Sequence, residues 1–289
     1  MSSMKVTIVY FSGTGGTKRV AEALAKALIQ KQIQTEVYEL IYEQFPQNGD
    51  EDLLIVLYAV HALNAPEPVY QWIRGMERVD GISAAVISVS GGGEVMPNTA
   101  CRTAVIRKLK AKGYCVNYET MLVMPSNFLI QADHNTALRL LQVLPERAER
   151  IADDLISGKA VRTSPNIIDR VLSFLGEGEK LVTGLFGRGI KADGGCNGCG
   201  LCERNCPTKN ISLENKKPVF SKRCVMCLRC IYNCPKNALH AGAGKSIVFK
   251  TGYSLDRLER EAENTKPTKE LPKGVAWAGV KKYLEEQQG

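Results

Sequence analysis

The sequence predicts an α/β protein in which a doubly wound parallel sheet is followed by a second, smaller domain. Two observations carry this prediction. Apolar segments of strand length alternate with helical periodicity over the first 160 residues, and most of the cysteines and the excess of basic residues lie far downstream. The chain has 289 residues, 44% hydrophobic and 24% charged, which is typical of folded globular proteins. This length suits two compact domains better than one.

The first strand is expected at 6–11, and the helix after it carries apolar residues at Val20, Leu24 and Leu28. Near-continuous apolar strands separated by helices indicate a parallel sheet covered on both faces. Five such strands suit the spatial order 2-1-3-4-5. The later strands are expected at 35–40, 53–58, 82–89 and 114–124, and the later helices at 66–76, 97–112 and 135–157, the last kinked at Pro145.

The net charge of +8 lies entirely in the last third of the chain, because residues 1–190 hold twenty basic and twenty acidic side chains. Such a region suggests nucleic acid as a partner, but it also holds eight of the ten cysteines. The other two, Cys101 and Cys115, are expected to be buried. No stretch is apolar enough to span a membrane, and the N-terminal residues lack a secretion pattern. We therefore expect a cytoplasmic protein.

The loop after the first strand combines hydroxyl side chains with glycines. A phosphate needs backbone N–H donors, the positive end of a helix and hydroxyl groups, and this loop offers all three. The loop matches neither the Walker pattern nor the dinucleotide fingerprint. It predicts a phosphate site, the alternative being a tight turn that binds nothing. The candidate residues are Ser12, Gly13, Thr14, Gly15, Gly16 and Thr17.

A ligand of a doubly wound sheet lies beyond the carboxyl ends of the strands, where the strand order reverses. The loops 58–64 and 90–94 are expected there. Tyr58 and His61 are candidates to stack on a flat ring, and the glycines allow close backbone approach. The alternatives are a solvated histidine and a flexible turn. The candidate contacts are Tyr58, Ala59, Val60, His61, Ser90, Gly91, Gly92 and Gly93.

The eight downstream cysteines form two copies of the pattern C-x2-C-x2-C-x3-C-P, 28 residues apart. Three closely spaced thiolates can hold three corners of a cubane iron–sulfur cluster, and in two-cluster ferredoxins the fourth cysteine of each run binds the other cluster. Zinc is the alternative, but it leaves the extra cysteine of each run unexplained. The expected ligands are Cys196, Cys199, Cys202 and Cys234 for the first cluster, and Cys224, Cys227, Cys230 and Cys206 for the second.

The motif Ser12-x-Thr14-Gly15-x-Thr17 after a first strand resembles the FMN phosphate loop of flavodoxins, and the resemblance covers about residues 4–158. It implies FMN as a cofactor. Flavodoxins commonly carry an aromatic residue after the fourth strand that covers one face of the flavin, whereas this chain has glycines there. We expect the cysteine-rich domain to help cover the ring, the alternatives being Tyr58 and the tail after Ala241.

Residues 191–240 resemble bacterial-type ferredoxins with two [4Fe–4S] clusters, with a short hairpin formed by 211–213 and 218–220. The whole chain resembles the flavodoxin–ferredoxin fusions called EFR1-type ferredoxins, a family common in anaerobes. The resemblance implies electron transfer with a redox partner protein. Two clusters with their thiolates carry a charge of about −4, which offsets nine basic and three acidic side chains in 191–240 without nucleic acid.

The expected organisation is an FMN-binding flavodoxin-like domain at 1–160, a helical connector at 161–190, a ferredoxin domain at 191–240 and a tail at 241–289. An apolar stripe in the connector is expected to pack between the domains, the alternative being a membrane-surface or partner helix. The stripe comprises Ile167, Ile168, Val171, Leu172 and Leu175, followed by Leu181, Val182, Leu185 and Phe186. In the tail, 259–274 is expected to be extended and 275–287 to form a terminal helix.

The expected function is an electron carrier that relays electrons between FMN and two [4Fe–4S] clusters. The sequence leaves open whether the protein is also an enzyme. One alternative is a flavin-dependent reductase of a small substrate, and another is a ferredoxin carrier whose flavodoxin-like domain is an empty docking module. No NAD(P)H site is evident, so electrons are expected to come from another protein. The sequence does not indicate an oligomeric state.

Overall fold

A five-stranded parallel sheet forms the centre of the computed structural model, which describes residues 4–176 and 179–286. The strand order is β2-β1-β3-β4-β5, which confirms the doubly wound, flavodoxin-like fold. The strands are β1 (Lys5–Phe11), β2 (Gln34–Glu39), β3 (Leu53–Ala59), β4 (Ser83–Ser90) and β5 (Cys115–Val123).

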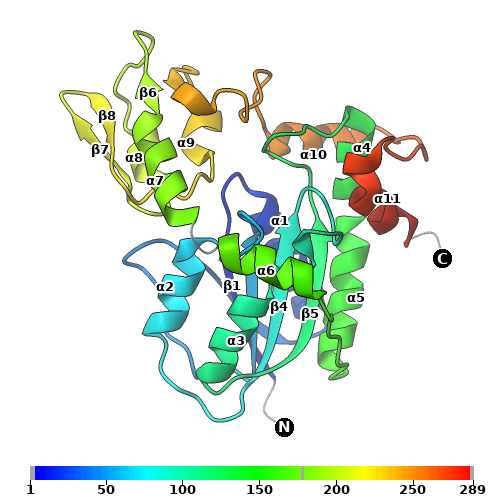
Figure 1. The fold of residues 1–289 in the computed structure, drawn as a ribbon. Helices are drawn as coiled ribbons and strands as arrows, with labels where there is room; N and C mark the ends of the chain where they lie inside the picture. The colour runs from blue at the N-terminus through cyan, green and yellow to red at the C-terminus, as the bar shows by residue number, and fades with distance from the viewer. Residues whose placement is uncertain (1–3, 177–178, 287–289) are drawn as a thin grey trace.

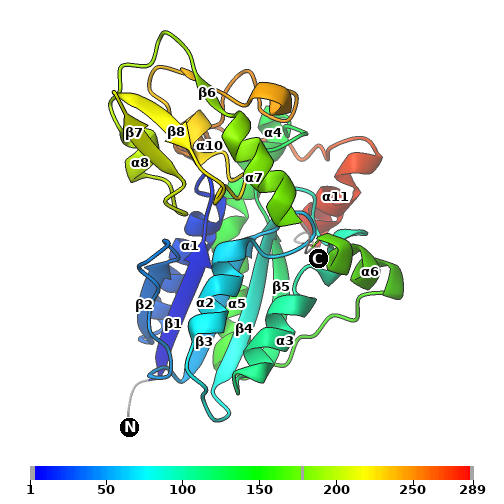
Figure 2. The ribbon, with the colours of Figure 1, turned by 60° about the vertical axis from the view of Figure 1, so that its left-hand side comes forward.

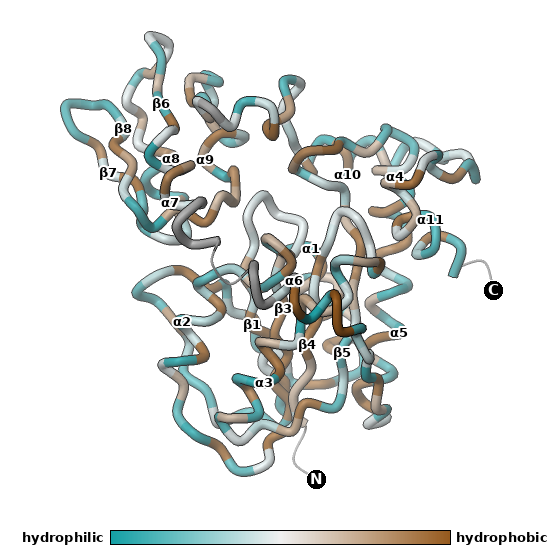
Figure 3. The backbone as a smooth tube through the Cα atoms, in the orientation of Figure 1, coloured by the Kyte–Doolittle hydropathy of each residue, from teal (hydrophilic) through white to brown (hydrophobic). Residues whose placement is uncertain are grey.

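Helices cover both faces of this sheet, as Figures 1 and 2 show. On one face lie α1 (Gly16–Gln30) and α5 (Leu144–Ile156), and on the other lie α2 (Glu67–Gly75) and α3 (Thr103–Ala111). Successive strand residues point to opposite faces, so Ile8 joins the core under α1 while Val9 joins the core under α2. Two buried layers explain why the central strands β1, β3 and β4 are buried along nearly their whole length, whereas the edge strand β2 is not (Figure 3).

Two of the predicted helices are interrupted. The expected helix at 135–157 is divided into α4 (His134–Gln142) and α5, because Pro145 in the first turn of α5 has no N–H to continue the preceding helix. Asp133 starts α4 by accepting a hydrogen bond from the Thr136 amide at 2.9 Å. The expected helix at 97–112 consists of a short 3-10 turn, η1 (Asn98–Ala100), followed by α3.

The connector forms α6 (Ile167–Gly176) and α7 (Glu179–Gly189). In α6 the prediction of an inward apolar stripe is wrong for Ile167, Ile168 and Val171, which are 79%, 62% and 53% exposed. Among the side chains of α6 that the structure describes, the buried ones are Asp169 and Ser173. They face inward because the sheet loops offer polar partners there: the Ser173 hydroxyl donates to the side-chain oxygen Oδ1 of Asn64 at 2.8 Å, and Thr99 donates to Asp169.

In α7 the residues of the predicted stripe also differ in burial. Leu185 is 54% exposed, whereas Phe186 packs against the core of the cysteine-rich domain. The other stripe side chains lie outside those that the structure describes: Leu172, Leu175, Leu181 and Val182.

The cysteine-rich domain contains two small antiparallel sheets above the carboxyl ends of the large sheet (Figure 1). Strands β6 (Lys191–Ala192) and β9 (Leu239–His240) pair with each other, and β7 (Ile211–Glu214) and β8 (Lys217–Phe220) form the predicted hairpin. Each cysteine run includes a one-turn helix, α8 (Leu201–Arg204) or α9 (Arg229–Tyr232). The small core comprises Ile190, Leu228, Ile231, Leu239 and Ala241.

The C-terminal tail returns to the first domain. After the 3-10 turn η2 (Gly242–Gly244), it forms α10 (Leu255–Asn264), η3 (Val275–Trp277) and α11 (Ala278–Glu285). The prediction of extended chain from 259 is wrong as far as Asn264, because α10 is capped by Ser254 and anchored by Leu255. Val280, Tyr283 and Leu284 join the same core from α11. Gln287, the last residue of the predicted terminal helix, lies outside the described residues.

Among the helices of the described residues, none combines the length and the hydropathy needed to cross a bilayer.

Candidate functional site

The loop between β1 and α1 has the backbone of an anion-binding turn. Gly15 takes a φ of 99°, which a side chain would disfavour, and the Ser12 hydroxyl oxygen accepts hydrogen bonds from the amides of Gly15 and Lys18 at 3.2 Å each. The Thr17 hydroxyl is buried and has no hydrogen-bond partner among the described residues. A buried hydroxyl without a partner is costly, and a ligand oxygen in this loop would give the Thr17 hydroxyl an acceptor.

A cavity of about 410 Å³ opens beside this loop at the carboxyl edge of the sheet. This volume falls in the range of small-molecule and cofactor sites. The lining includes most of the candidate contacts predicted from the sequence: Ser12, Gly13, Thr14, Gly16, Thr17, Ala59, Val60, His61, Ser90, Gly91 and Gly92.

Three candidate contacts lie elsewhere. The prediction that Tyr58 stacks on a flat ring is wrong, because β3 continues through Ala59 and the Tyr58 ring is fully buried. The Tyr58 hydroxyl donates to the Cys101 carbonyl at 3.2 Å. Gly93 does not line the cavity, since its backbone contacts Gly279 of the tail. Gly15 does not line it either, and its neighbours are Arg19 and Leu255.

His61 joins the cavity to the cysteine-rich domain. Its Nδ1 lies 3.0 Å from the carbonyl oxygen of Val225. Burial lowers the pKa of His61 to about 4, against a smaller raising effect of that hydrogen bond. The imidazole is therefore neutral at pH 7, with Nδ1–H as the donor. His61 thus serves as an interdomain contact as well as a cavity wall.

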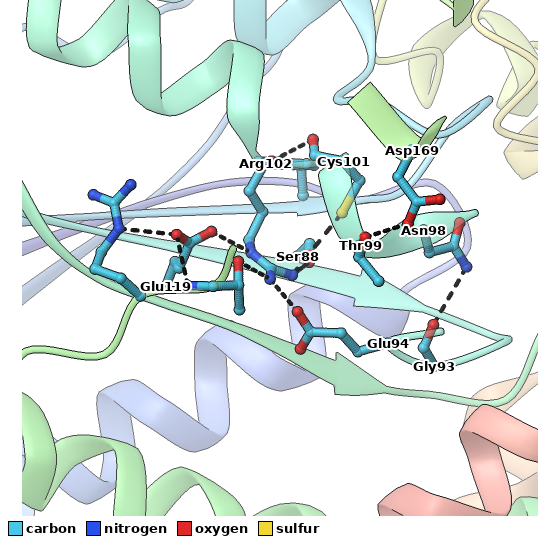
Figure 4. A network of polar contacts seen from close by, with 12 residues as sticks. Ser88, Gly93, Glu94, Asn98, Thr99, Cys101, Arg102, Glu119 and Asp169 are labelled. Carbon is cyan, nitrogen blue, oxygen red and sulfur yellow. Dashed lines mark hydrogen bonds and ion pairs between the residues drawn. The ribbon is translucent and has the colours of Figure 1, made fainter. Parts of the chain in front are cut away.

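A buried ion-pair network fixes the loop after β4 (Figure 4). The Arg102 guanidinium, 1% exposed, donates to the Glu119 carboxylate of β5 and to the Ser88 hydroxyl of β4, both at 2.9 Å. It also binds Glu94, which follows the glycines of the loop. Asn98 donates to the Gly93 carbonyl at 3.3 Å. The loop after β4, residues 90–94, is therefore fixed by charge-assisted hydrogen bonds and is not a free turn.

Several residues of the cavity wall are absent from the sequence-based prediction. Asn127, from the loop after β5, donates to the Thr14 hydroxyl at 2.8 Å. Tyr253 and Trp277 come from the tail, more than 100 residues from the loops they adjoin. Tyr253 is fixed by a 2.7 Å hydrogen bond to the Pro125 carbonyl. No local pattern in the sequence places these residues at the site.

The first predicted set of cysteines shares one small cavity. Cys196, Cys199 and Cys202 line it together with Cys234, which comes from the other run. Of the eight cysteines in the two runs, Cys199 is the exposed one. Within 4–176 and 179–286, no group of three or more His, Cys, Asp or Glu side chains could hold a single metal ion. A cubane cluster binds its cysteines on four separate irons and needs a wider spacing than one ion does.

The second set gathers around Cys206. Burial and the neighbouring Cys227 raise the pKa of the Cys224 thiol to about 12, and Cys206 acts on it in the same direction. Burial also raises the pKa of the Cys230 thiol well above its ordinary value, with contributions from Cys227, Cys224, Cys206 and, last, Cys202 of the first set. Thiols in this environment need a cation to become thiolates, which iron supplies. The four-thiol donor set therefore fits an iron–sulfur cluster.

The two cysteine runs repeat their backbone as well as their sequence. The Cys206 sulfur accepts from the Asn210 amide and the Cys234 sulfur from the Ala238 amide, both at 3.3 Å. Hydrogen bonds to ligand sulfur are a recognised influence on cluster potential. Left-handed residues also recur 28 positions apart, with Gly198 and Gly200 in the first run matched by Met226 and Leu228 in the second.

The cysteines outside the runs differ in burial. Cys101 is buried, as predicted, but the prediction that Cys115 is buried is wrong. Cys115 begins the edge strand β5 and points away from the sheet core, whereas the next residue, Val116, points inward.

The second cysteine run, residues 224–234, lies directly against the loop between β1 and α1. A Cβ added at Gly13 would lie 2.8 Å from the Cys227 carbonyl oxygen and 3.1 Å from its Cβ, so no side chain fits there. Arg229 donates to the Gly13 carbonyl at 2.7 Å and to the Ser12 carbonyl at 2.6 Å, and it also pairs with Glu39. The first domain and the candidate second cluster therefore share an interface at the cavity rim.

Comparison with known families supports the cysteine-rich domain. Residues 195–238 match the family described as the 4Fe-4S dicluster domain. No curated protein matches the chain.

The solved structures that are similar include several flavodoxins. "Structure of a flavodoxin from the domain Archaea" is 19% identical with a TM-score of 0.36, and the Streptococcus pneumonia TIGR4 flavodoxin is 17% identical with a TM-score of 0.40. Oxidised Flavodoxin 2 from Bacillus cereus is 14% identical with a TM-score of 0.39. Each alignment covers 53% of this chain and 99% of the other. The fold assignment rests on the strand order and not on these similarities.

Proposed function

We propose that this protein transfers electrons between FMN at the carboxyl edge of the sheet and two [4Fe–4S] clusters, and exchanges them with a redox partner protein. The flavodoxin-like fold and the dicluster domain support the general role of electron transfer. Bound FMN exchanges one or two electrons whereas each cluster exchanges one, so the combination connects two-electron with one-electron chemistry.

The observation that carries this proposal is the contact between Gly13 and Cys227. It brings a predicted cluster ligand to the rim of the predicted phosphate site without an intervening side chain. The hydrogen bonds of Arg229 to Ser12 and Gly13 hold the two loops in this position. Proximity of this kind is what a direct electron path requires, and it argues against two domains that act independently.

Each part of the cavity has a distinct task in this proposal. The backbone of the β1–α1 loop and the Thr17 hydroxyl bind the phosphate, because the hydroxyl is buried without a protein partner. The 59–61 and 90–92 loops hold the flavin ring between them, and the neutral His61 keeps this edge in contact with Val225. The phosphate loop offers no lysine like that of a Walker loop, so the backbone N–H groups and the helix dipole of α1 are the positive partners that the loop itself supplies.

The first cluster site, with Cys199, is the part of the electron path that is accessible to a partner protein. Cys199 is exposed there, and Lys216 and Lys236 lie beside the same cavity and are exposed as well. The second cluster site faces the large sheet instead, since Val225 and Cys227 contact its loops. We therefore infer the order FMN, second cluster, first cluster, partner protein, with a partner that presents acidic side chains.

The composition of the purified protein tests this function. Anaerobic purification is expected to yield about eight irons, eight sulfides and one FMN per chain, because each cubane contains four irons. Iron and sulfide assays, together with flavin extraction, provide the measurement. Zinc in place of iron, or four irons after full reconstitution, would overturn the cluster assignment. A chain with both clusters that does not bind added FMN would instead be a carrier with an empty docking domain.

The electron path is tested by Arg229→Ala. Removing the guanidinium breaks its contacts with Ser12, Gly13 and Glu39, so the two loops separate and electron exchange between flavin and clusters should slow clearly. Photoreduction of the flavin, followed by time-resolved absorbance at flavin and cluster wavelengths, measures this rate. Arg188→Ala is the matched control, because Arg188 is exposed on α7. Equal rates in both variants, with unchanged iron and flavin content, would contradict the path.

A further inference from the structure

Aromatic side chains line the cavity, although the loop after β4 contains none. Trp277 and Ala276 line the same cavity as the phosphate loop residues, and both belong to the C-terminal tail. The lining residues from the described part of the chain come from the sheet loops and the tail, none from 191–240. The aromatic lining therefore comes from the tail, with Tyr253 and Trp277, and from the loop after β5, with Phe128, and not from the cysteine-rich domain.

Trp277 is positioned by a close contact between two glycine backbones. A Cβ added at Gly279 would lie 2.2 Å from the Gly92 carbonyl oxygen, and one added at Gly93 would lie 2.6 Å from the Gly279 carbonyl carbon. Neither position can accept a side chain unless α11 moves. The glycines after β4 therefore have a structural task that differs from ligand contact: they let the start of α11 approach the sheet edge.

The rest of the tail is anchored on both sides of this contact. Beyond Trp277, Tyr283 is buried under the Arg147 guanidinium, which lies 4.3 Å from the ring centre and donates to the Tyr283 carbonyl at 2.5 Å. Before it, Asp256 and Glu259 of α10 form ion pairs with Arg19. Arg19 lies one turn into α1, directly after the phosphate loop. The tail thus crosses the cavity from the phosphate end to the glycine loop.

We propose that Trp277 is the flavin-stacking residue of this protein and that the tail acts as a strap that closes the flavin site. The inference rests on the proposed function, because it assumes that the cavity binds FMN. An indole stacked on the ring removes apolar surface from water and quenches flavin fluorescence. In this protein the stacking aromatic comes from the end of the chain, and the loop after β4 contributes the glycines that admit it.

FMN titration into the flavin-depleted full chain, with its clusters intact, tests this proposal. Trp277→Ala is expected to weaken FMN binding about tenfold, the effect of losing one aromatic stacking contact, and to leave bound FMN more fluorescent. Trp277→Phe should restore most of both properties. Val275→Ala is the matched control, because Val275 is 94% exposed in the same turn, and it should bind like the wild type.

The outcomes separate this inference from the proposed function. If the wild-type chain does not bind FMN, the proposed function fails. If the wild type binds and Trp277→Ala binds equally well with equal quenching, only the stacking role of Trp277 is overturned. Gly93→Ala provides a second variant, because it displaces the start of α11 while Trp277 remains in the chain. It should reproduce the loss of affinity and quenching, and wild-type values would contradict the strap.

Discussion

Replacing Cys206 by alanine is expected to remove the cluster of Cys224, Cys227 and Cys230, although Cys206 belongs to the other run. Iron content should fall from about eight to about four per chain, because a cubane that loses one of its cysteines is released or degraded. The reason is spatial: the Cys206 thiol acts on the pKa of Cys224, Cys227 and Cys230, with Cys202 a smaller influence on Cys230, whereas Cys234 lines the cavity of the first set. Iron analysis and electron paramagnetic resonance of the reduced protein provide the measurement.

Pairs of substitutions identify which cysteines share a cluster. Cys206→Ala combined with Cys227→Ala should lose no more iron than either single variant, since both would damage one cluster. Cys206→Ala combined with Cys199→Ala should lose nearly all of it. Cys115→Ala is the control, because Cys115 is exposed on the edge strand and belongs to neither run. The reverse pattern, with Cys206 and Cys199 behaving as one unit, would show that each run holds its own cluster.

Replacing Arg102 by methionine is expected to destabilise the protein by about 3–5 kcal/mol. This is the cost of removing one side of a buried ion pair, here with Glu119, which is 3% exposed and keeps only the more exposed Arg162 as a charged partner. The substitution also releases Ser88 and Glu94, so the glycine loop loses its support from below. Anaerobic urea unfolding of the full chain, followed by far-ultraviolet circular dichroism, measures the free energy of unfolding.

Two further variants separate the buried charge from lost packing. Arg162→Ala removes the other ion pair of Glu119, but Arg162 has a 39% exposed side chain and should cost about 1 kcal/mol or less. Combining Arg102→Met with Glu119→Gln removes both charges and should recover part of the lost stability. If Arg102→Met and Arg162→Ala cost the same, the buried network does not carry the stability assigned to it.

The parts of this protein that follow from local sequence were predictable. The cysteine runs are recognisable from spacing alone, because an iron–sulfur cluster demands thiols at short fixed intervals. The strand order and the position of the β1–α1 loop follow from the alternation of apolar strands and helices. In each case the determining residues lie within one loop or one element.

The parts that depend on distant contacts were not predictable. Composition made 259–274 look extended, but the charges of α10 find a partner in Arg19, about 240 residues earlier. Ile167, Ile168 and Val171 of α6 are exposed because Asn64 and Thr99 bind the polar residues of the helix, which periodicity cannot reveal. Trp277 is a further case, since its place depends on two glycines about 190 residues apart meeting backbone to backbone.

The return of the tail to the first domain means that the cysteine-rich domain is attached to the large sheet at both of its ends. It enters through α6, held by Asp169 and Ser173, and leaves towards Tyr253, held at Pro125. A domain attached twice samples few orientations, so its local concentration near the flavin site is fixed by the chain and not by diffusion. The internal electron transfer that we propose is therefore a first-order process, whose rate does not change when the protein is diluted.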